Sequence, residues 1–331
     1  MSSIHFNSNS YTSIHSGTRL IITGAVHGNE TCGTKAIHRV IADIEAGRLE
    51  ILSGSVTFVP VCNPLAYRHQ RRHGERNLNR RLMPTAQPQE FEDHVANWLC
   101  PLLAKHEVLL DLHSFRGEGE PFVLTGPENN DGTLEPFQFA DQELAMAQVL
   151  GVHRIVDGWL STYALGAQRR QARLPSTASN KRRADAQILF GVGTTEYMRT
   201  VGGYGMTLEC GGHEDADAPE VAYQAIINTL KHFGMIDGTA APTSRLEYLR
   251  ICDVVDKLHA DDRFVRAWRS FDVLHQNDLV GIRHDGTEVR AQMDGRIIFP
   301  DEAAGADEEW FYVTRYHLQD AAPVAMAGAQ L

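Results

Sequence analysis

Four residues in three separated motifs have the types and spacing needed to hydrolyse an amide bond at a metal ion. His27 and Glu30 form a His-x-x-Glu pair, His113 ends the motif Asp-Leu-His, and Glu209 precedes Cys-Gly-Gly. Two imidazoles and one carboxylate suit Zn²⁺ with an open coordination position, and Zn²⁺ lowers the pKa of a bound water to about 7. A neighbouring carboxylate can take that proton and later deliver it to the leaving amine. The sequence therefore predicts a Zn²⁺ site formed by His27, Glu30 and His113, beside Glu209 as general base.

A turn histidine with an ordinary structural role is the competing interpretation of His27. In a chain of 331 residues with 16 histidines, a His-x-x-Glu pair is expected about once by chance. His27 and Glu30, however, follow the apolar run 20–22, and His113 ends a second apolar run, 108–112. Side chains at the carboxyl ends of such strands meet at the edge where open α/β sheets bind ligands. This shared placement favours the metal site.

An arginine-rich segment, residues 67–82, follows the strand-like run 56–61. Its arginines are Arg68, Arg71, Arg72, Arg76, Arg80 and Arg81. A nucleic-acid patch and a solvated basic face are alternative interpretations of such a segment. The whole chain has a net charge of −11, and no aromatic stacking platform accompanies the run, which argues against nucleic acid. Bidentate recognition of a carboxylate close to the metal is the prediction that we favour.

The motifs occur in an order that resembles the succinylglutamate desuccinylase and aspartoacylase family of zinc carboxypeptidase-like amidohydrolases. In this chain the order is His-x-x-Glu, Asn-Pro at 63–64, an arginine followed by Asn-Leu-Asn-Arg at 77–80, Asp-Leu-His at 111–113 and Glu-x-Gly at 209–211. The resemblance extends from Ile21 to about Gly212. Its specificity comes from the agreement of five separated motifs, none of which would suffice alone.

The resemblance implies a role for each matching residue. It makes His27, Glu30 and His113 the ligands of one Zn²⁺ and Glu209 the carboxylate that activates the metal-bound water. It further implies that Arg72 polarises the scissile carbonyl, that Asn79 and Arg80 hold the substrate's carboxylate, and that Arg199 is a second anion-binding arginine. Removing a donor that stabilises charge on the carbonyl oxygen typically costs about 3 kcal/mol, which is the scale expected for Arg72.

Composition excludes several other classes of protein. The chain has no long uninterrupted apolar segment and no charged-then-apolar start, so we expect neither a membrane-spanning helix nor a secretory signal. The chain has five cysteines, an odd number, and no Cys-x-x-Cys motif. This pattern is typical of proteins with reduced thiols in the cytoplasm. Cys32 and Cys210 neighbour the predicted site, but we do not expect a thiolate ligand or nucleophile there, because the two histidines and the glutamate already supply the metal ligands. The oligomeric state stays open, with a homo-oligomer among the possibilities.

Alternating strand-like and helical runs predict an α/β fold with a mostly parallel central sheet, flanking helices and a zinc carboxypeptidase-like architecture. The strand-like runs are 20–23, 56–61, 108–112, 122–124, 153–156 and 206–209. The helical runs are 34–45, 88–105, 137–150 and 219–233. The arginine-containing stretch 169–183 is expected to form a surface loop. The catalytic domain should therefore cover residues 1–238.

A small β domain is expected at residues 244–331, after a linker rich in Gly, Thr, Ala and Pro. Asp285-Gly286 and Asp294-Gly295 are typical of hairpin turns. In the resembled family, such a domain packs over the mouth of the active site and restricts long substrates. The aspartoacylase branch sometimes contributes a tyrosine from this region, and either Tyr312 or Phe311 occupies the matching position.

Together these features predict a Zn²⁺-dependent amidohydrolase that removes an acyl group from a small N-acyl amino acid. A metallocarboxypeptidase acting on short peptides is the enzymatic alternative, because the same constellation serves both reactions. A non-catalytic protein that binds an anionic ligand through Arg72, Arg80 and Arg199 is the alternative from another class. The presence of Glu209 beside all three ligands disfavours pure binding, which needs no base.

Overall fold

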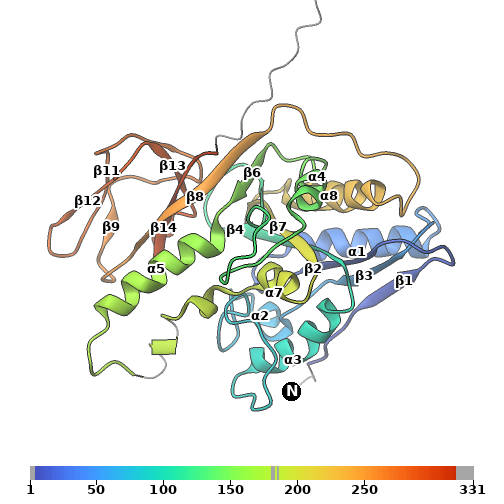
Figure 1. Cartoon of the computed structure of the whole chain (residues 1–331), viewed down its shortest axis with the longest axis horizontal. Helices are drawn as coiled ribbons and strands as arrows, with labels where there is room; N and C mark the ends of the chain where they lie inside the picture. The colour runs from blue at the N-terminus through green and yellow to red at the C-terminus, as the bar shows by residue number, and fades with distance from the viewer. Residues whose placement is uncertain (1–3, 180–182, 185, 318–331) are drawn as a thin grey trace, which may run out of the picture.

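A large β-sheet crosses the molecule in the computed structural model, which describes residues 4–179, 183–184 and 186–317 (Figure 1). The order of its 11 strands is β1-β3-β2-β4-β7-β5-β6-β8-β14-β13-β10, and β12-β11-β9 form a second sheet of three strands. The strands of the first part of the chain are β1 (Asn9–Thr12), β2 (Arg19–Gly24), β3 (Ser55–Val59), β4 (Val108–Phe115), β5 (Phe122–Leu124), β6 (Arg154–Asp157) and β7 (Tyr204–Gly212). Those of the last part are β8 (Glu247–Asp256), β9 (Arg263–Phe264), β10 (Val273–Leu274), β11 (Leu279–Ile282), β12 (Glu288–Arg290), β13 (Gly295–Ile298) and β14 (Glu309–Tyr316).

The large sheet is mixed, so the prediction of a mostly parallel sheet is wrong for the sheet as a whole. Strands β3-β2-β4-β7 are parallel, as are β5-β6-β8. Strand β5 runs antiparallel to β7, and β1, β14, β13 and β10 also pair antiparallel. The chain passes from β4 to β5 through residues 116–121, which is too short for the crossover that a parallel strand requires. Connection length therefore sets the direction of β5.

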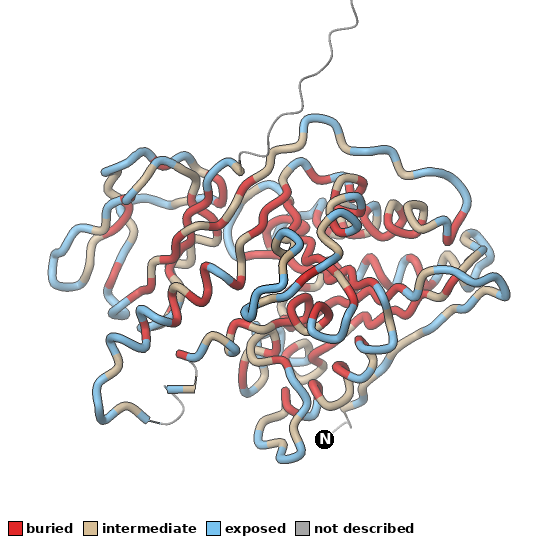
Figure 2. Tube along the Cα trace, in the orientation of Figure 1, coloured by how far each residue is buried: buried red, intermediate tan, exposed pale blue. Residues whose placement is uncertain are grey.

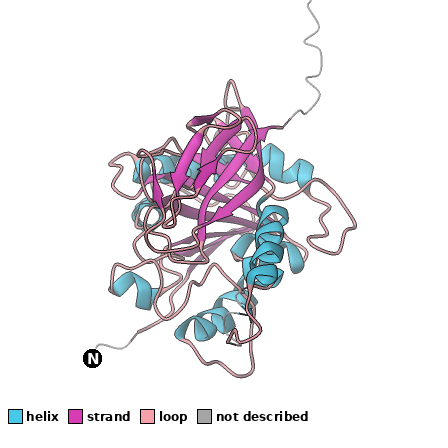
Figure 3. Ribbon diagram, turned by 90° about the vertical axis from the view of Figure 1, so that its left-hand side faces the viewer, coloured by secondary structure: helices cyan, strands magenta, loops and turns pink. Residues whose placement is uncertain are grey.

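Helices cover both faces of the parallel part of the sheet (Figures 1 and 3). The helices are α1 (Cys32–Glu45), α2 (Pro64–Arg68), α3 (Phe91–Leu103), α4 (Ala140–Ala147), α5 (Trp159–Arg173), α7 (Thr194–Thr200) and α8 (Ala218–His232), with a 3-10 turn at Ile188–Gly191. Leu20 and Ile22 of β2 pack in one core cluster with side chains of α1 and α8, whereas Ile21 packs with α3. The alternation of strand side chains thus divides the core into two layers.

Burial follows this layering, and the central strands are the most deeply buried part of the chain (Figure 2). All eight residues of β4 are buried. A strand that is covered on both faces has an almost continuous apolar sequence, and for this reason β2 and β4 can be predicted from the sequence. None of the helices among the described residues is long and apolar enough to cross a membrane.

The predicted elements of the α/β part are confirmed, with shifted ends, but the expected surface loop at 169–183 is wrong in its first part. Residues 169–173 are the last turn of α5, and Arg170 is buried there. Residues 180–182 of that stretch lie outside the described residues. The sequence carries no local signal for this helical turn, because four of its five residues are polar and the burial of its arginines depends on a carboxylate more than 80 positions away.

The strands after the linker extend the large sheet, since β8 pairs parallel with β6 and antiparallel with β14. The predicted boundary between the two domains, at residues 238 and 244, falls in the loop between α8 and β8, and the division into domains stays a prediction. Residues 318–331 of the predicted C-terminal domain lie outside the described residues. The hairpin turn at Asp285-Gly286 is confirmed between β11 and β12. The turn predicted at Asp294-Gly295 is wrong, because Gly295 begins β13, which pairs with β14 and β10.

Candidate active site

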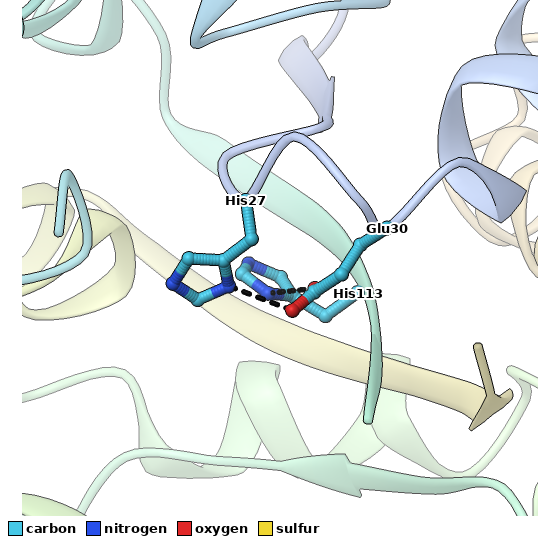
Figure 4. A group of neighbouring side chains, drawn as sticks. All are labelled: His27, Glu30 and His113. Carbon is cyan, nitrogen blue, oxygen red and sulfur yellow. Dashed lines mark ion pairs between the residues drawn. The ribbon is translucent and has the colours of Figure 1, made fainter. Parts of the chain in front are cut away.

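The predicted metal ligands come together because β2 and β4 are parallel neighbours. Gly24 of β2 lies opposite Leu112 of β4, so the turn that follows β2 is placed beside His113. The turn packs tightly, since a Cβ on Gly28 would lie 2.0 Å from the backbone carbon of Ala66. Only glycine fits there without moving α2. His27, Glu30 and His113 point toward one another (Figure 4).

The donor atoms of this group fit a zinc ion. Glu30 Oε1 is 2.9 Å from His27 Nδ1, and Glu30 Oε2 is 2.9 Å from His113 Nδ1. The ligand atoms of the three residues lie within 4.8 Å of one another, and all three side chains are buried. Although Glu30 Oε1 lies 2.9 Å away, His27 Nδ1 forms no well-directed hydrogen bond with any described residue. A buried imidazole nitrogen beside a carboxylate, without such a bond, is what a bound cation would satisfy.

The outer nitrogens of both imidazoles are held by other side chains. His27 Nε2 donates to Asn77 Oδ1 at 2.9 Å, and His113 Nε2 donates to Asp111 Oδ2 at 2.8 Å. Asp111 also accepts from Thr23 Oγ1 at 2.6 Å. Such partners fix the tautomer and the ring orientation of metal-binding histidines. They direct both Nδ1 atoms toward Glu30, where the ion would be held.

The charge states of the ligands follow from burial and from their neighbours. Burial, aided by the Arg72 charge, lowers the pKa of His27 to about 4, so its imidazole is neutral at pH 7. Burial alone would raise the pKa of Glu30, but the two histidines hold it well below the usual range. Burial opposes the charged form of His113 too, yet Asp111 and Glu30 raise its pKa well above normal. A cation that binds here therefore displaces a proton from His113.

Glu209 lies on the next strand, opposite His113 in the register of β4 and β7. It is buried, and its Oε2 has no hydrogen-bond partner among the described residues. Burial, together with the charges of Glu30 and Cys32, raises the pKa of Glu209 to about 8. A divalent cation nearby would lower that pKa again, since an opposite charge favours the carboxylate. A carboxyl group tuned in this way can both accept and return a proton near neutral pH.

Arg72 reaches the same place from the arginine-rich segment. Its Nη1 is 3.2 Å from Glu30 Oε1, while 45% of its side chain stays exposed to the cavity and solvent. The segment is anchored by Glu92 of α3, which is fully buried and accepts hydrogen bonds from the backbone N–H groups of residues 74, 75 and 76. Arg76 donates to Asp93 at 2.9 Å, and this contact gives it a structural role.

Asn79 and Arg80 both line the cavity that opens from the ligand group. Asn79 Oδ1 accepts a hydrogen bond from the backbone N–H of Thr194 at 3.0 Å. The Arg80 guanidinium lies over the rings of Trp159 and Tyr163, at 5.2 and 5.4 Å from their centroids. Its Nη1 donates to the carbonyl of Asn79 at 2.9 Å.

Arg199 is placed differently from the other predicted residues. It is buried at the end of α7, where Nη1 lies 2.8 Å from Glu135 Oε1 and Nη2 lies 3.1 Å from Glu143 Oε1. It lines a smaller cavity of about 220 Å³ and is absent from the lining of the main one. These contacts tie α7 to the segment 135–143, and they give Arg199 a structural role.

Asp111 and Asn77 contact the two histidines of the site, although the sequence motifs predicted no role for either residue. Asp111 could have been found from the strand pattern, because residues i and i+2 of a strand share a face and Asp111 must therefore accompany His113. Asn77 carried no such signal, since its approach to His27 depends on the path of residues 69–80. Neither Cys32 nor Cys210 lines the main cavity, and Cys32 donates its thiol to the carbonyl of His113 at 3.3 Å.

The main cavity has a volume of about 1100 Å³, and its lining includes the ligand group, Glu209 and Arg72. A further part of its wall is formed by α5, by Phe299 and Tyr312, and by the connection between β13 and β14. Tyr312 thus faces the cavity, whereas Phe311 packs in the separate core cluster around Trp310.

Comparisons with known proteins agree with this geometry. The sequence profile of the succinylglutamate desuccinylase/aspartoacylase catalytic domain matches residues 16–225. A succinylglutamate desuccinylase/aspartoacylase from Rhodobacter sphaeroides is similar in structure, with a TM-score of 0.69 and 18% identity over 95% of this chain and 90% of that one. The product-bound ectoine utilization protein EutE (DoeB) from Ruegeria pomeroyi gives a TM-score of 0.67 and 19% identity over 93% and 88%. A comparison with curated protein sequences gives no significant match.

Proposed function

Because the chain belongs to the succinylglutamate desuccinylase/aspartoacylase family, whose members are deacylases, we propose that it is a Zn²⁺-dependent amidohydrolase acting on a small N-acyl amino acid. The observation that carries the proposal is the buried His27, Glu30 and His113 group, with Glu209 on the adjacent strand. A cytoplasmic location, homo-oligomer formation and a separate C-terminal domain over the mouth stay predictions.

In this proposal each residue around the cavity has one task. His27, Glu30 and His113 would hold Zn²⁺, which when bound would supply Lewis acidity and lower the pKa of water. Glu209, buried on the strand beside His113, takes the proton of the attacking water and returns it to the leaving amine. Arg72 stabilises the negative charge that develops on the carbonyl oxygen.

Asn79 and Arg80 orient the substrate by binding its carboxylate. Arg80 is almost enclosed by the rings of Trp159 and Tyr163, and this enclosure supports the assignment because a guanidinium that has few alternative positions loses little entropy on binding. A bidentate contact between guanidinium and carboxylate contributes roughly 1.5–3 kcal/mol. Arg80→Lys should therefore raise KM about tenfold or more.

The test combines metal content with substrate turnover. Purified protein should bind one Zn²⁺ per chain and hydrolyse N-acetyl or N-succinyl amino acids faster than di- and tripeptides with the same C-terminal residue. His27→Ala should lose the metal and the activity while staying folded, and His15→Ala, which changes an exposed histidine outside the cavity, should keep both. Efficient tripeptide cleavage with negligible deacylation would instead identify a metallocarboxypeptidase, and absence of bound Zn²⁺ under all conditions would refute the proposal.

A further inference from the structure

The carboxylate of Glu309 lies between two arginines of the cavity wall. Its Oε2 is 3.6 Å from Arg80 Nη2, and its Oε1 is 3.3 Å from Arg170 Nη1. Glu309 is the first residue of β14, and Arg170 belongs to the last turn of α5. All three side chains line the main cavity. Glu309 therefore occupies a place where a second substrate carboxylate would otherwise find two guanidinium groups.

Carboxylates neutralise most of the positive charge of the arginines in this wall. Arg170 Nη1 is also 2.7 Å from Asp256 Oδ1, and Arg173 pairs with the other oxygen of Asp256. Three arginines thus share two carboxylates, so the cluster keeps a net charge of about one positive unit, which matches a single substrate carboxylate bound by Arg80.

Arg199 is absent from the lining of the main cavity and supplies no guanidinium group there. Arg199, the residue expected from the sequence to bind a second anion, is surrounded by the carboxylates of Glu135, Glu143 and Glu196. It lies in the lining of the smaller cavity instead. Its charge is compensated inside the protein.

The remaining surface of this wall suits a neutral group. Trp159, Tyr163 and Tyr312 present aromatic rings, with Trp159 and Tyr312 centroids 5.4 Å apart. The buried hydroxyl of Tyr312 has no hydrogen-bond partner among the described residues, and the same is true of Arg170 Nη2. An unpaired buried donor is costly, and an acceptor on the substrate, such as the amide oxygen of a neutral side chain, would satisfy it. A carboxylate could accept from the same donors, so the selection against a second negative charge rests on the Glu309 carboxylate.

From these contacts we infer that Glu309 is a specificity-determining residue that restricts the pocket to N-acyl amino acids with one carboxylate and a neutral side chain. The inference rests on the proposed function and names its substrate class. An aspartate or glutamate side chain in this position would meet the Glu309 carboxylate in a partly dehydrated site, and like charges there disfavour binding. A glutamine side chain has the same shape without that repulsion.

The test compares N-acetylglutamine with N-acetylglutamate, because the acetyl group is neutral and the two compounds then differ only in the charge of the side chain. The Zn²⁺-loaded wild type should prefer glutamine by about tenfold or more in kcat/KM. Glu309→Gln should shrink that preference about tenfold or more, chiefly by lowering KM for the glutamate substrate. Glu302→Gln is the matched control, since it removes a carboxylate from the same connection outside the cavity lining, and it should leave the preference unchanged.

Equilibrium binding of the same two ligands, measured by calorimetry, separates this inference from the proposed function. If neither compound is hydrolysed but Glu309→Gln still shifts the binding preference, only the proposed function fails. If Glu309→Gln does not fold, Arg170→Gln replaces it, and it should increase the preference for glutamine because the wall then has no net charge. Three results would overturn the inference. The wild type could use both substrates equally, Glu309→Gln could change kcat/KM by the same factor for both substrates, or neither ligand could bind.

Discussion

Replacing Asp111 by asparagine should weaken zinc binding without removing any ligand. Asp111 is fully buried and accepts hydrogen bonds from His113 Nε2 at 2.8 Å, from Thr23 Oγ1 at 2.6 Å and from Thr194 Oγ1. An asparagine has one acceptor oxygen for these three donors, and its NH2 group, if it faces His113, cannot accept a hydrogen bond from Nε2–H. His113 would then favour the tautomer with the proton on Nδ1, the atom that faces Glu30.

The expected loss follows from this change of tautomer. Replacing the partner of a metal-binding histidine typically lowers metal affinity 10- to 100-fold, which is about 1.4–2.7 kcal/mol. The affinity can be measured by competition for Zn²⁺ with a chromophoric chelator. Asp253→Asn is the matched control, because Asp253 is also buried but pairs with Arg169 on α5. An unchanged dissociation constant in a folded Asp111→Asn protein would refute the argument that Asp111 sets the tautomer of His113.

Three further changes should have distinct effects. Glu209→Gln should retain Zn²⁺ and lower kcat by about 10² or more in steady-state assays, whereas loss of metal would make Glu209 a ligand instead. Glu92→Ala should lower the free energy of unfolding by about 3 kcal/mol or more in urea titrations, because it leaves the backbone N–H groups of residues 74, 75 and 76 without their acceptor; a smaller loss would mean that water replaces the carboxylate. Burial, aided by Glu196 and Glu143, raises the pKa of Glu135 from 4.5 to about 7. Between these pH values the folded state holds a proton on Glu135 that the unfolded state has lost, so the free energy of unfolding should fall as pH rises from about 4.5 to 7. Glu135→Gln should flatten that part of the stability profile, and an unchanged slope would assign it to other groups.

The structure shows which parts of the site a local pattern can reveal. The apolar runs of β2 and β4 and the turn between β2 and α1 depend on neighbouring residues, so the sequence locates His27, Glu30 and His113 correctly at adjacent strand ends. Their convergence needed only that the two strands be parallel neighbours, which the alternation of strands and helices indicates. Zinc binding itself and the catalytic roles stay predictions for the experiments above.

The charge partners of the arginines were decided by the tertiary structure alone. The sequence predicts surface or ligand-binding roles for Arg199 and Arg170, yet both are buried, and their partners Glu143 and Asp256 lie 56 and 86 positions away in the sequence. Pairing at such separations depends on how helices pack on the sheet, and no local periodicity encodes it. The mixed direction of the sheet has the same origin, since connection length and the docking of β5, β8 and β14 decide it. The sequence thus determined the chemistry that is present, whereas the fold decided which of its charges remain available to a substrate.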